Sequence, residues 1–354
     1  MIPMIPMISI VGGGIAGCSI ALELSKDKTN NITIYEQNEL LNNEHYCHAH
    51  YGLLYPDISK EELVQLTKET MMFIEAYPEA ILYRPTIIAY NVKSKYSVKE
   101  LQERCLIVEK TTKVSPFFKK YTYDDFFNLP TESYLDYFDS YVYNTLKFIK
   151  NSEFVSSIKF PFVCVKEYGI DYTILRNSIM NKILKTNNIK IINEQKEMNA
   201  IPYTNPIPCT NPIVIIATGS YGKVNVETKG SFTVHLNNSV EYLAEFVIIG
   251  ERGTENGMFQ VTPIRYNKLV IHKMSEEGSL GKFNITYINN IFSSLFTLTI
   301  ISITPNIGRQ EVNNSIEDRK SSINLHNGNY IIKLLKAGSA TYIAKQMAII
   351  LKSK

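Results

Sequence analysis

The chain has 354 residues, of which 45% are hydrophobic and 20% charged, a composition typical of a folded globular protein. This length is large for one domain, so two lobes are expected. The formal net charge of +3 gives no strong field for a nucleic acid or an anionic membrane, and the longest apolar stretch, 291–303, is too short to span a bilayer. We therefore expect no nucleic-acid partner and no stable membrane insertion.

The cysteines are scattered and odd in number, and none forms a CxxC pair. They are Cys18, Cys47, Cys105, Cys164 and Cys209. This pattern fits neither a disulfide framework nor a zinc site, so no metal is expected. It suits a reducing compartment and predicts a cytoplasmic protein.

The first 36 residues have the pattern of a parallel βαβ unit. An apolar run at 7–11 predicts a strand, the glycine-rich segment 12–17 follows, and a helical pattern comes next. A β-branched run at 32–35 predicts a second strand that ends at Glu36. Strand, helix and strand within about thirty residues are what a nucleotide-binding βαβ unit requires.

Each glycine of Gly12-x-Gly14-x-x-Gly17 has a physical task in such a unit. Gly12 makes the tight turn, Gly14 lets the backbone approach a pyrophosphate, and Gly17 lets the helix press against the sheet. Glu36 stands where an acidic side chain accepts hydrogen bonds from ribose hydroxyls. The predicted dinucleotide contacts are Gly12, Gly14, Ile15, Ala16, Gly17 and Glu36.

A second unit begins at Asp171, which is a predicted helix N-cap. Apolar residues follow at helical spacing, at positions 174, 175, 179, 183 and 184, and predict the buried face of a helix. A strand is expected at 189–192. The fully apolar run 213–216 is typical of a central parallel strand with both faces covered, and it ends in Ala217-Thr218-Gly219.

The rest of the chain lacks a nucleotide-binding pattern. Residues 80–155 are rich in Tyr, Phe and Lys, and the runs 246–249 and 268–272 predict strands. One helix is expected near 287–296. The last segment contains the apolar run 331–335, then Gly338 and an apolar-periodic helix to Leu351.

These elements predict an α/β protein with a Rossmann-type lobe built on a parallel sheet and an antiparallel sheet-rich substrate lobe. The nucleotide-binding lobe is expected to be discontinuous, from residues 1–80, 155–229 and 305–354. The substrate lobe is expected to take residues 81–154 and 230–304.

Several segments, in chain order, resemble the D-amino-acid oxidase/glycine oxidase superfamily of FAD enzymes. The segment from Cys47 to Pro56 resembles the family's loop after the second strand, which lies along the pyrophosphate and flavin. The others are Tyr168-Gly169-Ile170-Asp171, Ala217-Thr218-Gly219, Gly308-Arg309 followed by Asp318, and the terminal segment 334–340. The chain departs from the family at 327–333, where only one glycine stands, and at Gln310, where the family has proline.

The resemblance implies FAD as the cofactor and a wider set of cofactor-binding residues. These are His48, His50, Gly52, Leu53, Ala217, Thr218, Gly219, Lys333 and Lys336. His48 and His50 are interpreted as hydrogen-bonding partners of phosphate or flavin rather than attachment points. Lys333 and Lys336 are candidates for the positive charge beside the reduced flavin.

The resemblance also implies catalysis by hydride transfer from the C–N bond of an amino acid or secondary amine. Arg309 is the first candidate to hold a substrate carboxylate through two parallel hydrogen bonds, and Arg265 is the second. Alternatives remain open: oxidation of a hydroxy acid, the FAD lobe of a tRNA-modifying enzyme, and a degenerate protein that binds flavin structurally. The electron acceptor, oxygen or a quinone, is also open.

Overall fold

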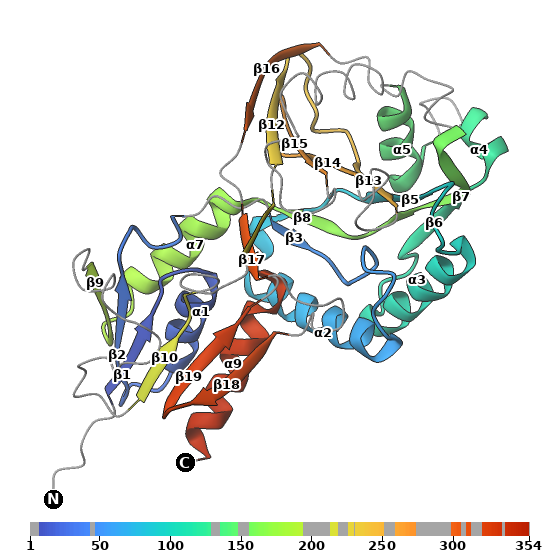
Figure 1. Cartoon of the computed structure of the whole chain (residues 1–354). Helices are drawn as coiled ribbons and strands as arrows, with labels where there is room; N and C mark the ends of the chain where they lie inside the picture. The colour runs from blue at the N-terminus through green and yellow to red at the C-terminus, as the bar shows by residue number, and fades with distance from the viewer. Residues whose placement is uncertain are drawn as a thin grey trace, which may run out of the picture.

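The computed structural model describes residues 7–42, 47–128, 135–147, 156–193, 213–218, 226–229, 231–250, 259–273, 299–305, 309–312, 321–334 and 337–353. Two large sheets dominate this part of the chain. Figure 1 shows one at the lower left and the other at the upper right. The predicted combination of a parallel nucleotide-binding sheet with an antiparallel-rich sheet is confirmed.

The first sheet has six strands in the order β18-β19-β10-β1-β2-β9. Their bounds are β18 Ser322–His326, β19 Asn329–Lys333, β10 Ile213–Ile216, β1 Met7–Val11, β2 Asn31–Glu36 and β9 Ile189–Asn193. The strands from β19 to β9 are parallel, and β18 is an antiparallel edge strand. The predicted strands at 7–11, 32–35, 189–192 and 213–216 are therefore present, and β10 is internal as expected.

Three helices pack on this sheet and form one core with it. They are α1 (Ile15–Leu24), α7 (Tyr172–Leu184) and α9 (Ala340–Lys352), and α1 lies against both of the others. The apolar faces of α1 and α9 meet through side chains such as Ile20 and Ile343, which are both buried. The C-terminal helix thereby supports the helix that follows the glycine turn.

The second sheet has eight strands in the order β16-β12-β15-β14-β13-β5-β7-β6. Their bounds are β16 Ile300–Pro305, β12 Ser231–Leu236, β15 Lys268–Lys273, β14 Phe259–Pro263, β13 Glu245–Ile249, β5 Thr86–Asn91, β7 Ile158–Val165 and β6 Phe118–Tyr121. Neighbours are antiparallel except β13 and β5, which are parallel. The predicted strands at 246–249 and 268–272 lie at its centre.

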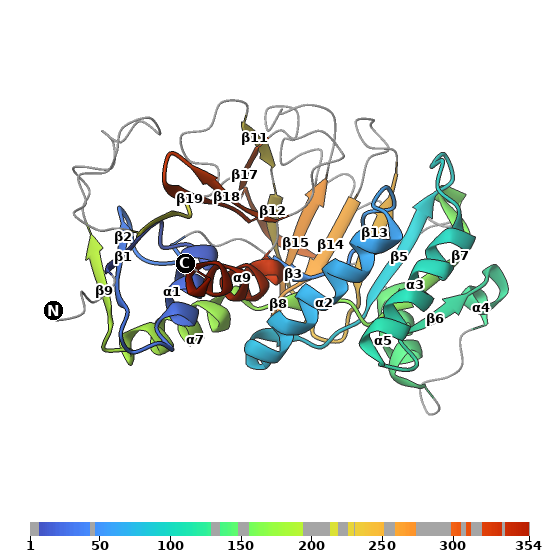
Figure 2. The same ribbon diagram turned by 90° about the horizontal axis from the view of Figure 1, so that it is seen from below.

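Both faces of this second sheet are covered, as Figure 2 shows for the helices on one side. Helices α2 (Lys60–Ala76) and α3 (Val98–Thr112) share a core with one face, which includes Val247 and Ile249. Helix α5 (Tyr137–Lys147) shares a core with the opposite face, which includes Phe246 and Ile248. The short helix α4 (Tyr123–Phe127) follows β6.

Small elements connect the two large sheets. A three-stranded sheet has the order β3-β8-β4, with bounds Cys47–Ala49, Tyr168–Ile170 and Ile81–Leu82. Two single-turn helices are η1 (Pro78–Ala80) and η5 (Ala337–Ser339). Strand β11 (Val226–Lys229) pairs with β17 (Arg309–Val312). The loop after β3 thus begins between the two large sheets.

Some expectations need correction. Leu184, expected on the buried face of its helix, is 69% exposed because α7 ends there. The parallel β13–β5 pair was not expected, since strand periodicity does not identify a strand's partner. Strand β7 lies within the predicted middle segment of the nucleotide lobe but pairs in the eight-stranded sheet. The division into lobes otherwise stays a prediction, and the helix expected near 287–296 falls outside the described residues.

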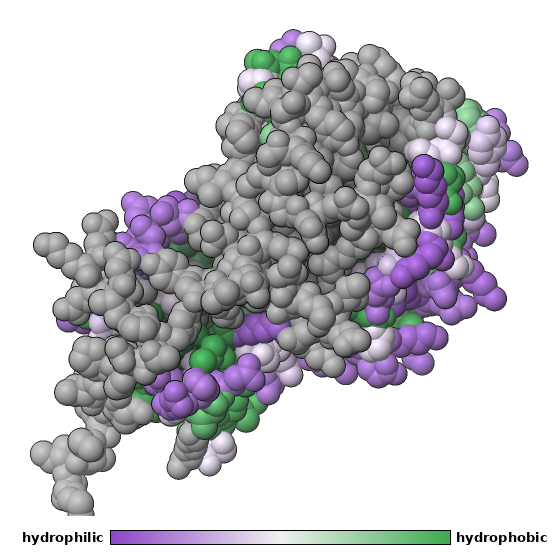
Figure 3. Space-filling model, in the orientation of Figure 1, coloured by the Kyte–Doolittle hydropathy of each residue, from purple (hydrophilic) through white to green (hydrophobic). Residues whose placement is uncertain are grey.

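The described surface mixes hydrophilic and hydrophobic residues. Leu325 of β18 and Ile349 of α9 are exposed, and Figure 3 shows hydrophobic groups among hydrophilic ones at the end of the molecule where these elements lie. Among the described residues, no helix has both the length and the apolar character needed to cross a membrane.

Candidate functional site

The glycine turn after β1 is packed so closely that side chains do not fit at two positions. Gly12 has φ of +103°, and a Cβ there would lie 2.6 Å from the carbonyl oxygen of Ala217. A Cβ on Gly17 would lie 1.9 Å from the carbonyl oxygen of Gly12. The turn is therefore pressed against the residue that follows β10 on one side and against its own helix on the other. The predicted tight turn at Gly12 and close helix packing at Gly17 are present.

Among the described residues, no side chain caps the N-terminus of helix α1. Its N-cap, Gly14, is exposed and has no side-chain capping hydrogen bond, and the first turn holds no acidic residue. A Cβ on Gly14 would meet no atom of the described residues within 4 Å. An uncapped helix N-terminus beside open space is a binding site for a phosphate, because its N–H groups and the helix dipole attract negative charge. Gly14, with Ile15 and Ala16 of the first turn, fits a pyrophosphate.

Glu36 is directed back at the glycine turn from the end of β2. The backbone N–H of Gly13 donates to its Oε2 at 2.6 Å, and the N–H of Asn38 donates to its Oε1 at 3.0 Å. The carboxylate retains further lone pairs for ribose hydroxyls. Glu36 is therefore placed both to brace the turn and to accept hydrogen bonds from a nucleotide.

Replacing Glu36 with alanine should weaken cofactor binding without unfolding the protein. A ribose hydroxyl and the Gly13 N–H would each lose an acceptor, a cost of roughly 1–3 kcal/mol, or about 5- to 150-fold in affinity. Titration of apoprotein with FAD measures the loss, and exposed Glu39→Ala serves as the control. An unchanged affinity would mean that Glu36 braces the turn only.

Cys18, in the first turns of α1, is not a nucleophile. Burial, together with the nearby charge of Glu36, raises the pKa of its thiol to about 12. The thiol is protonated at neutral pH and contacts the carbonyl oxygen of Gly13 at 3.2 Å. Its role in the site is to hold the turn.

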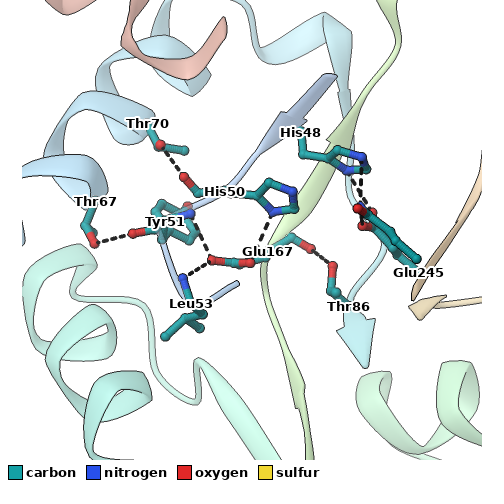
Figure 4. Close-up of polar contacts among 10 residues, drawn as sticks. His48, His50, Tyr51, Leu53, Thr67, Thr70, Thr86, Glu167 and Glu245 are labelled. Carbon is teal, nitrogen blue, oxygen red and sulfur yellow. Dashed lines mark hydrogen bonds and ion pairs between the residues drawn. The ribbon is translucent and has the colours of Figure 1, made fainter. Parts of the chain in front are cut away.

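The loop after β3 is held by one buried carboxylate. Glu167, between β7 and β8, is fully buried and accepts from the N–H groups of Tyr51 at 2.9 Å and Leu53 at 3.2 Å (Figure 4). Its second oxygen lies 3.2 Å from Nδ1 of His50. The loop carrying Gly52, whose φ is +108°, is thereby fixed against the eight-stranded sheet.

His48 lies beside a second buried carboxylate, from the eight-stranded sheet. Its Nδ1 is 3.0 Å from Oε2 of Glu245 in β13, although the approach is off the ideal hydrogen-bond direction. The amide nitrogen of Gln260 in β14 lies 3.0 Å from Nε2 of His48 and also donates to Glu245. Figure 4 shows His48 and His50 side by side between Glu245 and Glu167, and their rings stack at 4.4 Å.

The ionisation of Glu245 follows from these contacts. Burial by itself disfavours the carboxylate, but the neighbouring imidazoles of His48 and His50 and the hydrogen bond from Gln260 outweigh it. The pKa of Glu245 therefore lies below its ordinary value, and the group is a carboxylate at neutral pH. The site contains two buried acids and two imidazoles at the junction of the sheets.

The sequence predicted His48 and His50 as partners of phosphate or flavin, which stays a prediction, and did not single out Glu167, Glu245 and Gln260. A signal exists in β14, where Gln260 and Thr262 alternate with apolar residues and so share a face. Glu245 opens an otherwise fully apolar strand. A buried polar residue in such a run needs a partner, which the linear sequence does not name.

Arg265 has a partner in the structure. It lies in the connection after β14, and its Nε contacts Oδ2 of Asp171, the N-cap of α7. Nearby, Arg84 donates to the carbonyl oxygens of Val240 and Ile264, and burial lowers its pKa. A substrate carboxylate would have to compete with Asp171 for Arg265, so its role as a clamp stays a prediction.

The other predicted site residues are only partly placed. Arg309 begins β17, opposite Lys229 of β11, and Lys333 ends β19. Ala217 donates its N–H to Val11 at 2.7 Å, and Thr218 follows it at the end of β10. Leu53 is buried in the core with its N–H bonded to Glu167. Gly219, Gly308 and Lys336 lie outside the described residues.

A family comparison identifies the part of the chain that carries the glycine turn. Residues 7–105 match the DAO family model, described as FAD dependent oxidoreductase. Over these residues the chain is similar to FAD-dependent oxidoreductases of the DAO family, which confirms the predicted resemblance. FAD is therefore the cofactor, and the chain is an FAD-dependent oxidoreductase, as predicted. The uncapped N-terminus of α1 and the open space at Gly14 fit this cofactor.

Solved structures share the fold over nearly the whole chain. Glycine oxidase from Geobacillus kaustophilus is 12% identical with a TM-score of 0.65, covering 98% of this chain and 94% of that one. L-proline dehydrogenase from P. horikoshii is 13% identical with a TM-score of 0.65, covering 100% and 95%. Iminodiacetate oxidase from Chelativorans sp. BNC1 is 10% identical with a TM-score of 0.61, covering 98% and 95%. No curated protein sequence matches the chain.

Proposed function

We propose that this FAD-dependent oxidoreductase oxidises the C–N bond of an amino acid or a secondary amine. The observation that carries the proposal is the shared fold, because the solved structures of this fold include enzymes named for glycine, proline and iminodiacetate oxidation. FAD, when bound, supplies the acceptor for the hydride of the substrate carbon. The residues of this chain bind, orient and deprotonate the substrate.

The chain's own groups support a substrate that carries an amino group. Glu167 and Glu245 are buried, acidic and close to the loop after β3, so the junction of the sheets favours a cation. Arg309 remains the proposed clamp for a substrate carboxylate, with Arg265 as the second candidate. The protein is proposed to act in the cytoplasm on a small molecule.

The purified protein should be yellow and should release FAD on acid precipitation. Anaerobic addition of glycine, proline or N-alkylated glycine should bleach the flavin, and the corresponding hydroxy acids should not. Dithionite serves as the positive control for reducible flavin. Flavin that dithionite bleaches but no amine does, or that only a hydroxy acid bleaches, would contradict the proposal.

The Arg309→Lys variant adds a second arm to this experiment. An ammonium group does not reproduce the planar two-point contact of a guanidinium with a carboxylate, so KM for amino acids should rise. For amines without a carboxylate, KM should rise less, because these substrates make no contact with the guanidinium. An equal loss for both donors removes Arg309 from the substrate site.

A further inference from the structure

The hydrogen-bond pattern around Gln260 determines which nitrogen of His48 carries a proton. The Gln260 amide faces Oε1 of Glu245, and a carboxylate only accepts hydrogen bonds, so the group facing it is the NH2. The same NH2 lies 3.0 Å from Nε2 of His48 and can only donate to it. Nε2 is therefore an acceptor, and the proton of a neutral His48 is on Nδ1, 3.0 Å from Oε2 of Glu245.

We propose that His48 is the proton acceptor of the amine oxidation, and that Glu245 and Gln260 are its positioning residues. This inference rests on the proposed function. An ammonium substrate must lose a proton before its nitrogen lone pair can assist oxidation of the C–N bond. The N–H bond breaks, its electron pair stays on the substrate nitrogen, and the proton forms a new bond with Nε2 of His48. The Gln260 amide gives up its hydrogen bond to the Nε2 lone pair of His48, so that this lone pair faces the substrate. The amide keeps its contact with Glu245.

Buried charge favours this transfer. Before it, the Glu245–His48 pair has a net charge of −1 in a site where Glu245 is 3% exposed. After it, an imidazolium faces a carboxylate and the pair is neutral. Unpaired buried charge is costly, so accepting a proton relieves the pair. A carboxylate beside Nδ1 and an unprotonated Nε2 are the arrangement of a histidine general base.

The surrounding titratable groups limit the uptake to one proton. His50 stacks on His48 at 4.4 Å and contacts Glu167, while the ring of His272 lies 6.4 Å away, edge-on. Arg84 adds a positive charge close enough to interact with Glu245. Two stacked imidazolium ions would repel each other, so we expect His48 alone to gain the proton.

A metal ion is the alternative occupant, because ligand atoms of His48, His50 and Glu245 lie within 4.8 Å of one another. Metals lie in the plane of each imidazole ligand. The two rings are stacked at 16°, so their lone pairs run side by side rather than toward one point. Both Nδ1 atoms also face carboxylates. The geometry favours proton transfer over metal binding.

The test compares holoenzyme variants by the rate at which an amine reduces the flavin under anaerobic conditions, as a function of pH. His48→Gln should slow the reduction, measured per bound flavin, by about 10²–10⁴-fold near neutral pH, while dithionite still reduces that flavin. The deficit should shrink at alkaline pH, where the amine loses its proton unaided. Glu245→Gln should show the same pH pattern to a smaller extent. Exposed His326→Gln is the matched control and should behave as wild type.

A deficit in His48→Gln that is equal at every pH would overturn the inference. Loss of a purely structural side chain would slow flavin reduction by the same factor at every pH. A His48→Gln variant that reduces flavin at the wild-type rate would also overturn the inference, but it would leave the proposed function intact. Failure of every amine to reduce wild-type flavin would overturn the proposed function and this inference together.

A second measurement does not depend on turnover. In ¹⁵N-histidine NMR of the holoenzyme at neutral pH, His48 should show a protonated Nδ1 and an unprotonated Nε2. Gln260→Leu should retain reduction within about tenfold and mix the two tautomers. A protonated Nε2 in wild type overturns the inference, even if His48→Gln fails to bind FAD.

Discussion

Gly17→Ala should strongly weaken FAD binding and destabilise the six-stranded sheet. The added Cβ would lie 1.9 Å from the carbonyl oxygen of Gly12, which belongs to backbone and cannot rotate away. Forced overpacking costs on the order of 1–3 kcal/mol in stability. The displacement of the turn that relieves this overlap also misdirects the N–H groups of α1. A further loss of about 3 kcal/mol in binding would correspond to roughly a hundredfold in affinity.

Gly14→Ala is the matched control for this prediction. Its Cβ meets nothing within 4 Å, so the apoprotein should melt at nearly the wild-type temperature. The methyl group would fill the space that the pyrophosphate needs, so FAD affinity should still fall. Thermal melting of both apoproteins and FAD titration separate the two effects. Equal melting temperatures for the two variants would show that the turn is less tightly packed than described.

Glu167→Ala should be the most destabilising single change in the junction between the sheets. The N–H groups of Tyr51 and Leu53 would lose their acceptor in the protein interior, and His50 would lose its carboxylate. Removing one partner of a buried charged network costs about 3–5 kcal/mol. Urea unfolding of the holoenzyme, followed by flavin fluorescence and circular dichroism, measures this loss.

Glu39→Ala provides the comparison with a surface carboxylate. Glu39 contacts Arg176 at 2.7 Å but its side chain is 74% exposed. Exposed ion pairs contribute roughly 0–1 kcal/mol, so this variant should unfold near the wild-type urea concentration. A loss for Glu167→Ala no greater than for Glu39→Ala would mean that water replaces the missing carboxylate.

Local patterns in the sequence predicted most of the cofactor-binding sheet. The glycine turn, the N-cap Asp171 and the apolar strand at 213–216 each depend on neighbouring residues, so their periodicity and capping are readable. The same reasoning placed Leu184 in the core, because spacing alone does not show where a helix ends.

The acid and amide that surround His48 were not predictable in the same way. Glu245 is nearly two hundred residues from His48 and reaches it because β13 pairs with β5 in parallel. Gln260 lies beside Glu245 and His48 because β14 pairs with β13 in an antiparallel manner. Strand periodicity gives the face of each side chain but not its neighbour across the sheet. Arg265 was expected to be available to a substrate, and its contact with Asp171 likewise joins distant segments.

The strand order of the six-stranded sheet has a consequence for biosynthesis. Strand β1 is made first, but its neighbour β10 begins at Ile213, and β19 begins at Asn329. At 5–20 residues per second, roughly 9–35 s separate the synthesis of Glu36 from that of β10. During that interval the apolar edge of β1 has no partner on one side, so the nascent chain is a client for chaperones that shield exposed strands. FAD can therefore be captured in its final site only after nearly the whole chain has left the ribosome.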